Sequence, residues 1–278
     1  MINTSYSKVQ TITCNRNNQI HDFHLVDPSP WPIVGAFSGL MLTFGAVLTM
    51  HAYYPGTFIL VLGLILLLLT KMCWWRDIIR EATFESQHTY TVQTGLRLGM
   101  FLFIVSEIMF FFAFFWAFFY LSLNSTPSIG AVWPPAESEI LDTFQIPLLN
   151  TILLLSSGAS VTWSHESVVF KKKFQAIISL FITILLALIF TALQGFEYIS
   201  APFNITDSAY GSTFYMATGF HGFHVLIGTL FLCVCFFRLY FDHFSSTHHI
   251  GFEAACWYWH FVDVVWLFLV VTVYWWGS

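Results

Sequence analysis

Charged residues are scarce in this sequence. Asp, Glu, Lys and Arg make up only 9% of its 278 residues, whereas soluble globular domains carry about 25%. Hydrophobic residues make up 57%, which excludes a disordered chain, because disorder requires low hydrophobicity and high net charge. The same composition excludes collagen-like proteins and nucleic-acid-binding tails. It therefore indicates a protein that crosses a membrane several times.

Cysteine is scarce as well. The sequence has five cysteines, at Cys14, Cys73, Cys233, Cys235 and Cys256. An odd number, mostly in or beside apolar runs, is not a disulfide framework, and we expect packed thiols. The N-terminus has neither the apolar core of a secretory signal nor an Arg-rich transit pattern, so we expect no cleaved targeting segment.

Seven apolar runs are long enough to cross a membrane, which takes about 20 residues of helix. They are predicted at 33–50, 57–72, 96–123, 146–163, 174–196, 212–237 and 252–276. The predicted fold is an all-α integral membrane protein with seven transmembrane helices. Its parts are a polar N-terminal segment (1–32), helices I and II (33–72), an amphipathic connection (73–95) and helices III to VII (96–278).

The predicted spans place all the basic residues on the same side of the membrane. All ten fall on one predicted side, at Lys8, Arg16, Lys71, Arg76, Arg80, Arg97, Lys171, Lys172, Lys173 and Arg238. The loops predicted on the other side carry acids only, at Glu137, Glu139, Asp142, Glu197 and Asp207. Because basic residues stay on the side of insertion, the N-terminus is predicted to face the matrix or cytoplasm, and the C-terminus the opposite side.

One carboxyl group lies well inside a predicted span. Glu107 is about ten residues into the third span, hence near the middle of the bilayer at about 1.5 Å per residue. An unpaired charge there is costly, so we expect the group to be protonated, hydrogen-bonded or both. Intramembrane acids are candidates for function, but an interhelical hydrogen bond that only fixes packing is an equal alternative. The sequence does not identify its partner.

Two further polar pairs lie in the last two spans. His221 and His224 are three residues apart, so they share a helix face and could bind one metal ion. His260 and Asp263 have the same spacing, and there the carboxylate could orient the imidazole. Small residues, which favour close helix packing, also lie along the sixth span at Gly219, Gly222 and Gly228. Interhelical hydrogen bonding is the favoured interpretation of all four polar residues, and a metal site is the alternative.

A mixed aromatic and charged segment follows the second span. It begins with WWRD at 74–77 and continues with Arg80, Glu81 and His88. Such residues gather at the membrane boundary, and arginines four apart on one helix face can hold a phosphate group. The alternatives are therefore an ordinary interfacial belt and a phospholipid headgroup site. The sequence contains no Gly-rich phosphate loop, nucleophile elbow or zinc-protease motif.

From residue 24 to its end, the sequence resembles subunit III of the haem–copper oxidases, and within that family the cytochrome c oxidase branch. The motifs that carry the resemblance are HLVDPSPWP at 24–32, WWRDIIRE at 74–81, FWAF at 115–118, WPP at 133–135, PLLNT at 147–151, YGSTF at 210–214, ATGFHG at 217–222 and the segment 251–278.

The resemblance implies a specific architecture and set of partners. Helices I and II are expected to be separated from the last five by a V-shaped cleft filled with phospholipid. Haem a and copper are expected in partner subunits I and II, with no metal ligand, redox centre or catalytic residue in this chain. Small accessory subunits and membrane phospholipids are further expected partners, and nucleic acid is not. The lipid-binding residues implied are Trp75, Arg80, Glu81, His88, Arg238, His243 and Trp257.

The expected role is a supporting subunit of a complex that oxidises cytochrome c, reduces oxygen to water and pumps protons. The expected location is the mitochondrial inner membrane, or a bacterial cytoplasmic membrane. Two alternatives remain open. One is the related subunit of a quinol oxidase, which typically lacks the first two spans. The other is an independent proton or ion carrier that uses the intramembrane polar residues Glu107, His221, His224, His260 and Asp263 as a relay.

Overall fold

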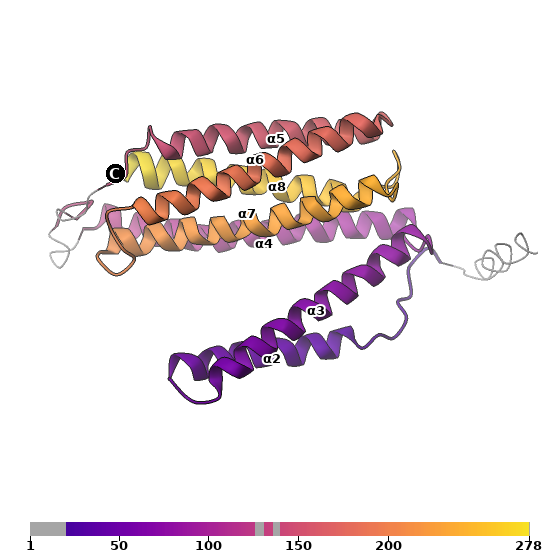
Figure 1. Cartoon of the computed structure of the whole chain (residues 1–278), viewed down its shortest axis with the longest axis horizontal. Coiled ribbons are helices and arrows are strands. Elements are labelled where there is room, and N and C mark those ends of the chain that lie inside the picture. The colour runs from indigo at the N-terminus through magenta and orange to yellow at the C-terminus, as the bar shows by residue number, and fades with distance from the viewer. Residues whose placement is uncertain (1–20, 126–130, 136–139, 278) are drawn as a thin grey trace, which may run out of the picture. The chain divides into compact units, whose positions relative to one another are not determined.

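A computed structural model describes residues 21–125, 131–135 and 140–277 of the chain. Within this part of the chain the secondary structure is helical, and seven helices are long and apolar enough to cross a membrane. They are α2 (Trp31–Met50), α3 (Gly56–Thr83), α4 (Tyr90–Leu123), α5 (Ile146–Val169), α6 (Lys173–Ser200), α7 (Ala209–Tyr240) and α8 (Ile250–Leu269), which the π-helix η3 (Val270–Trp276) continues (Figure 1). The predicted all-α fold with seven spans is confirmed. Cys14 and residues 1–20 of the predicted N-terminal segment lie outside the described residues.

Several helices are longer than the apolar runs that predicted them. The second run ends at residue 72, but α3 continues to Thr83, so only residues 84–89 of the predicted connection separate α3 from α4. Likewise α5 continues to Val169, and the chain turns at Lys171, whose φ is 59°. An apolar run measures only the part of a helix that lies in hydrocarbon, since a helix can continue into the polar interface.

The chain divides into two compact units, unit 1 (Met1–Gly95) and unit 2 (Leu96–Ser278). In unit 1, α2 and α3 pack against each other as a hairpin. The two backbones approach closely at glycines: a Cβ atom on Gly45 would lie 2.7 Å from Leu60 Cα, and one on Gly63 would lie 2.6 Å from the Leu42 nitrogen. Trp31 also donates its indole N–H to Asp77 over 2.7 Å, which joins the start of α2 to the last turns of α3.

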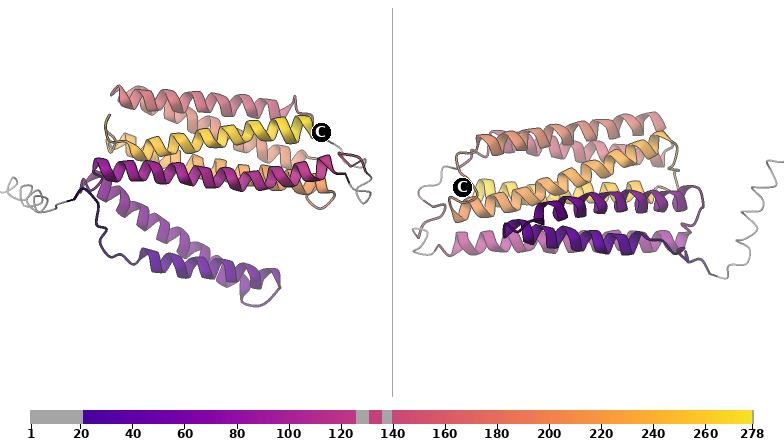
Figure 2. Two further views of the ribbon diagram at one scale, coloured as in Figure 1. Left: turned by 180° about the vertical axis from the view of Figure 1, so that it is seen from behind. Right: turned by 60° about the horizontal axis from the view of Figure 1, so that its bottom comes forward.

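Unit 2 contains α4 to α8 and η3, running side by side (Figure 2). Helix α8 is central: 56% of its most apolar stretch is buried, compared with 6% for α4. It packs against α5 and α7, and α6 packs against both of these helices. The largest fully buried side chains of this core include Trp259, Trp266, Tyr210 and Tyr274. The V-shaped cleft expected between the first two helices and the other five stays a prediction.

The three glycines of α7 behave differently from one another. Gly228 meets α8 closely, because a Cβ there would lie 2.9 Å from the Trp259 ring. Gly219 and Gly222 have no such neighbour within 4 Å. The expected close interface is therefore confirmed at Gly228 and is wrong at the other two, which lie on a different face of the helix.

The hairpin of unit 1 yields a stability prediction. Gly45→Ala should lower the stability of the α2–α3 hairpin by about 1–3 kcal/mol, because the added methyl group overpacks against the backbone of α3. Thermal denaturation of the purified protein in detergent would measure this loss. Gly39→Ala is the matched control on the same helix, since nothing lies within 4 Å of its Cβ position. Equal melting temperatures for the two variants would contradict the prediction.

Candidate functional site

The carboxyl group of Glu107, halfway along α4, has a clear partner in the structure. Its Oε2 atom lies 2.8 Å from Nε2 of His224 on α7, and the two side chains are 21% and 9% exposed. The His224 ring also lies 5.0 Å from the Phe111 ring, centre to centre. The structure thus supplies the partner that the sequence could not identify.

The hydrogen bonds of His224 restrict where protons can lie. Its Nδ1 atom lies 2.6 Å from the Phe220 carbonyl oxygen, which can only accept, so Nδ1 carries a proton. Glu107 and Nε2 of His224 therefore share one proton between them. The pair exists either as a carboxylic acid beside a neutral imidazole or as a carboxylate beside an imidazolium. Both forms are neutral overall and suit an apolar environment.

His221 takes part in a different contact. Its Nε2 donates to the Val262 carbonyl oxygen on α8 over 3.2 Å, and its ring lies 5.0 Å from that of Trp266. The Nε2 atoms of His221 and His224 thus contact different helices, α8 and α4 respectively. Among the described residues, no group of three or more His, Cys, Asp or Glu side chains could hold a metal ion. The geometry favours interhelical hydrogen bonding for both histidines.

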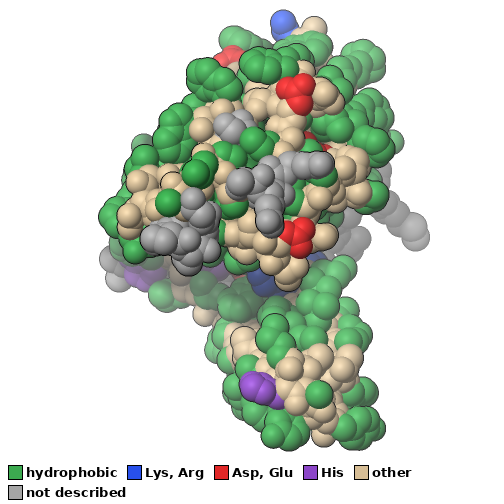
Figure 3. All heavy atoms as spheres, turned by 90° about the vertical axis from the view of Figure 1, so that its left-hand side faces the viewer, with side chains coloured by type: hydrophobic (Ala, Val, Ile, Leu, Met, Phe, Trp, Pro, Cys, Tyr) green, Lys and Arg blue, Asp and Glu red, His purple; other side chains and the backbone are tan. Residues whose placement is uncertain are grey.

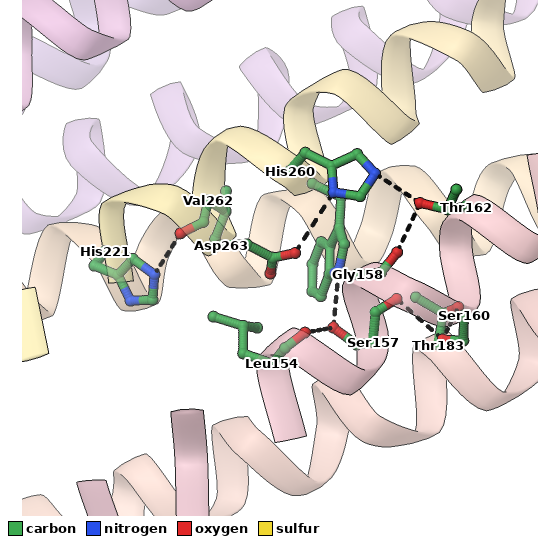
Figure 4. A network of polar contacts seen from close by, with 11 residues as sticks. Leu154, Ser157, Gly158, Ser160, Thr162, Thr183, His221, His260, Val262 and Asp263 are labelled. Carbon is green, nitrogen blue, oxygen red and sulfur yellow. Dashed lines mark hydrogen bonds and ion pairs between the residues drawn. The ribbon is translucent and has the colours of Figure 1, made fainter. Parts of the chain in front are cut away.

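His260 bridges α8 and α5 (Figure 4). Its Nε2 lies 3.1 Å from the Thr162 hydroxyl, and its Nδ1 lies 3.7 Å from Oδ2 of Asp263. The Thr162 hydroxyl also donates to the Gly158 carbonyl oxygen over 3.0 Å. Asp263 is buried and lies directly against Gly158, where any Cβ would clash with it. The hydrogen bond of the imidazole is thus made with Thr162 of α5, and orientation of the ring by Asp263 stays a prediction.

Other polar contacts hold the same helices together, and Figure 4 shows several of them. Trp259 donates its indole N–H to the Ser157 hydroxyl over 2.9 Å, and the hydroxyls of Ser160 and Thr183 lie 2.7 Å apart. These bonds join α5 to α8 and α5 to α6. Several intramembrane polar residues of unit 2 thus hydrogen-bond to one another across helix interfaces.

The four headgroup candidates of unit 1 lie at the end of α3 and just beyond it. Trp75 is 58% exposed and has the Lys71 ammonium 5.6 Å above its ring. Arg76 forms an ion pair with Asp77 at 2.8 Å, whereas the side chain of Arg80 is exposed and makes no hydrogen bond or ion pair with the described residues. Glu81 is partly buried, and the His88 ring lies 6.4 Å from that of His24.

In unit 2 the three candidates lie at the end of α7 and the start of α8. The Arg238 guanidinium is 4.3 Å from the centre of the Phe244 ring and contacts Gly251, and its Nε is buried without a partner among the described residues. Burial, together with the charge of Arg238, lowers the pKa of His243, so this ring is neutral at pH 7. Trp257 is 36% exposed.

The sequence reasoning missed two contacts. Arg97 on α4 pairs with Glu253 on α8 at 3.0 Å. Glu197, expected in a loop, lies instead in α6, is 1% exposed and accepts a hydrogen bond from Tyr274 over 2.6 Å. The expectation was wrong because Glu197 follows the end of an apolar run by one residue, although the helix continues to Ser200. The only sequence signal for a buried Glu197 was Gln194, which precedes it by three residues and so shares its helix face.

Comparison with known proteins gives a consistent result. The family model described as cytochrome c oxidase subunit III matches residues 21–278. This chain is also similar to proteins named cytochrome c oxidase subunit 3 from three organisms. The protein from Pylaiella littoralis is 62% identical over 93% of this chain and 95% of the relative. Those from Arabidopsis thaliana and Cyprinus carpio are each 59% identical over 94% of this chain, and the match covers 98% and 99% of the relative, respectively.

The Glu107–His224 contact yields a second stability prediction. Glu107→Ala leaves Nε2 of His224 without a partner, which should destabilise unit 2 by about 1–3 kcal/mol. Glu107→Gln should cost much less, because its amide can donate to the lone pair on Nε2. Thermal denaturation in detergent would compare the two variants with wild type. The hydrogen bond would have no structural role if Ala and Gln melted at the same temperature.

Proposed function

We propose a supporting role without a redox centre for this chain, which belongs to the cytochrome c oxidase subunit III family. It is thus a subunit of an oxidoreductase complex. We propose that the complex oxidises cytochrome c, reduces oxygen to water and pumps protons. We further propose that haem a and copper lie in partner subunits I and II, as the resemblance to this family implies.

The two alternative functions are less well supported. A quinol oxidase subunit typically lacks the first two spans, and this chain has both, as α2 and α3. An independent carrier would need Glu107, His224, His221 and His260 to form one relay. Instead, Glu107 pairs with His224, while His221 and His260 bond to other helices.

The observation that carries the proposed lipid-binding role is the environment of Arg238. A buried guanidinium nitrogen without a carboxylate partner is costly, unless an anion or a hydrogen-bond acceptor from outside the chain reaches it. Guanidinium groups bind phosphate through paired, charge-assisted hydrogen bonds. At the end of a membrane-spanning helix, a phospholipid headgroup is the phosphate within reach. We assign Arg238, His243 and Trp257 to one such headgroup.

A second headgroup position is proposed on unit 1. Arg80 is exposed and forms no ion pair within 4.0 Å among the described residues, whereas the neighbouring Arg76 is paired with Asp77. Trp75 is exposed on the same helix, where an indole suits the membrane interface. We assign these residues, with Glu81 and His88, to the binding of structural phospholipid.

We further propose that the chain lies in the mitochondrial inner membrane with its basic end toward the matrix. The sorting of all ten cations to one side supports this orientation. Subunits I and II and small accessory subunits are the proposed partners, with the chain supporting subunit I and its proton uptake. The exposed phenylalanines of α4, including Phe110 and Phe112, offer apolar oxygen a surface that it prefers to water.

Lipid binding is tested by removing both unpaired arginines. The complex with the double variant Arg80→Ala, Arg238→Ala should retain fewer phospholipids. This subunit should also dissociate from the complex more readily in detergent, since a bound lipid stabilises the protein surfaces that it bridges. Mass spectrometry of the extracted lipid and the subunit content of the purified complex would measure both effects. Lys171→Gln, Lys172→Gln is the control with the same change in charge. Equal lipid retention in the two double variants would refute the assignment.

The supporting role is tested at Glu107. We expect Glu107→Gln to leave the initial rate of oxygen reduction within about twofold of wild type, because the redox centres lie in other subunits. Glu107→Ala should show weaker subunit attachment or faster loss of activity during turnover. Oxygen consumption by the reconstituted complex would be measured over time. Abolition of oxygen reduction by Gln would make Glu107 an obligatory proton carrier and would overturn the supporting role.

A further inference from the structure

A buried polar cluster lies at the acidic end of unit 2, the end formed by residues 140–145 and 201–208 together with the adjoining helix ends. It contains Asn150 of α5, Gln194 and Glu197 of α6, Tyr210 of α7 and Tyr274 of η3. All five side chains are buried: Gln194 is 6% exposed, Glu197 is 1% exposed and the other three are fully buried. Four elements thus enclose one carboxyl group completely.

The hydrogen bonds within the cluster converge on one oxygen of that carboxyl group. Tyr274 donates its hydroxyl to Glu197 Oε1 over 2.6 Å, and Gln194 donates its amide N–H to the same oxygen over 3.3 Å. Asn150 in turn donates to Oε1 of Gln194 over 3.4 Å. Both the carbonyl oxygen of a carboxylic acid and an oxygen of a carboxylate can accept two such bonds, so the protonation state depends on the surrounding charges.

Three other polar atoms of the cluster have no hydrogen-bond partner among residues 21–125, 131–135 and 140–277. They are Oε2 of Glu197, the hydroxyl of Tyr210 and Oδ1 of Asn150. The rings of Tyr210 and Tyr274 lie 6.0 Å and 5.1 Å from the Phe214 ring, centre to centre, which places Tyr210 in the same part of the unit as the Tyr274–Glu197 hydrogen bond. Leaving such buried atoms unsatisfied is costly, because each loses its hydrogen bonds to water on burial. The cluster is therefore incomplete without a further group that forms hydrogen bonds.

No basic side chain in the described part of unit 2 is available to neutralise Glu197. The described basic residues of unit 2 all lie at the opposite end, at Arg97, Lys171, Lys172, Lys173 and Arg238. Figure 3, which views the acidic end, shows acidic side chains on this face of unit 2. A buried carboxylate without a positive partner is strongly disfavoured.

We propose that this cluster is a binding site for a proton and a buried water molecule. Glu197 holds the proton on Oε2, which leaves Oε1 as the double acceptor already described. The water molecule accepts a hydrogen bond from Oε2 and donates to the two other unpartnered oxygens. Buried waters typically form about three hydrogen bonds with such groups. Tyr274, which donates to Glu197, lies in the π-helix η3, and π-helical turns are frequent at functional sites.

Infrared spectroscopy of the assembled oxidase complex would test the protonation state. The difference spectrum between wild type and Glu197→Gln should show the carbonyl stretch of a protonated carboxylic acid, shifted downward in D2O. Tyr274→Phe should move this band to higher frequency, because Oε1 then loses its shortest hydrogen bond. Glu166→Gln, which alters an exposed acid of α5, is the control and should leave the band unchanged. Haem absorbance would confirm that every variant assembles.

The water molecule requires a separate measurement. Tyr210→Phe removes one group that the water contacts, so it should also shift the Glu197 band, although Tyr210 makes no direct hydrogen bond to this carboxyl group. An unchanged band in Tyr210→Phe would overturn the bridging water. Absence of the carboxylic acid band, or its loss when sodium or potassium replaces choline in the buffer, would overturn the proton site. The second result would assign the cluster to a monovalent cation.

Discussion

The fold depends on one constraint, the lack of hydrogen-bonding groups in the hydrocarbon around the helices. In hydrocarbon, a polar side chain must find its partner within the protein, because none is available outside it. Unit 2 meets this demand with bonds between neighbouring helices: the indoles of Trp259 and Trp266 donate to hydroxyls of α5, and Tyr198 of α6 donates to Thr218 of α7. Each bond holds two helices at a fixed register. Their polar side chains thus specify the arrangement, while apolar packing fills the space between them.

The same constraint has two different solutions at the two ends of unit 2. At the basic end, Arg238 remains charged, and we infer that a phosphate group from outside the chain completes its contacts. At the acidic end, Glu197 has no cation within reach, and we infer that it is neutral and completed by water. An arginine cannot give up its proton in a protein, whereas a carboxylate readily accepts one. The chemistry of each side chain therefore determines which solution applies.

Much of this organisation could be predicted from the order of residues. Apolar runs located all seven spans, and the position of Glu107 in the third run predicted a carboxyl group inside the membrane. Predictions failed at helix ends and on helix faces. The end of an apolar run placed Glu197 outside its helix by one residue, and composition alone could not show that Gly219 and Gly222 face away from the helix that Gly228 meets. Hydropathy records how apolar a segment is but not which side of it is covered.

The sequence by itself determined the fold class, the number of spans, the sorting of charge and the family, because these follow from local composition and from motifs along the chain. The tertiary structure decided which polar groups meet. His221 and His224 share a helix face, yet one contacts α8 and the other α4. Glu197 and Tyr274 are 77 residues apart in sequence and 2.6 Å apart in space. The physical reason is that partners depend on how helices rotate and cross, which packing of the whole unit sets.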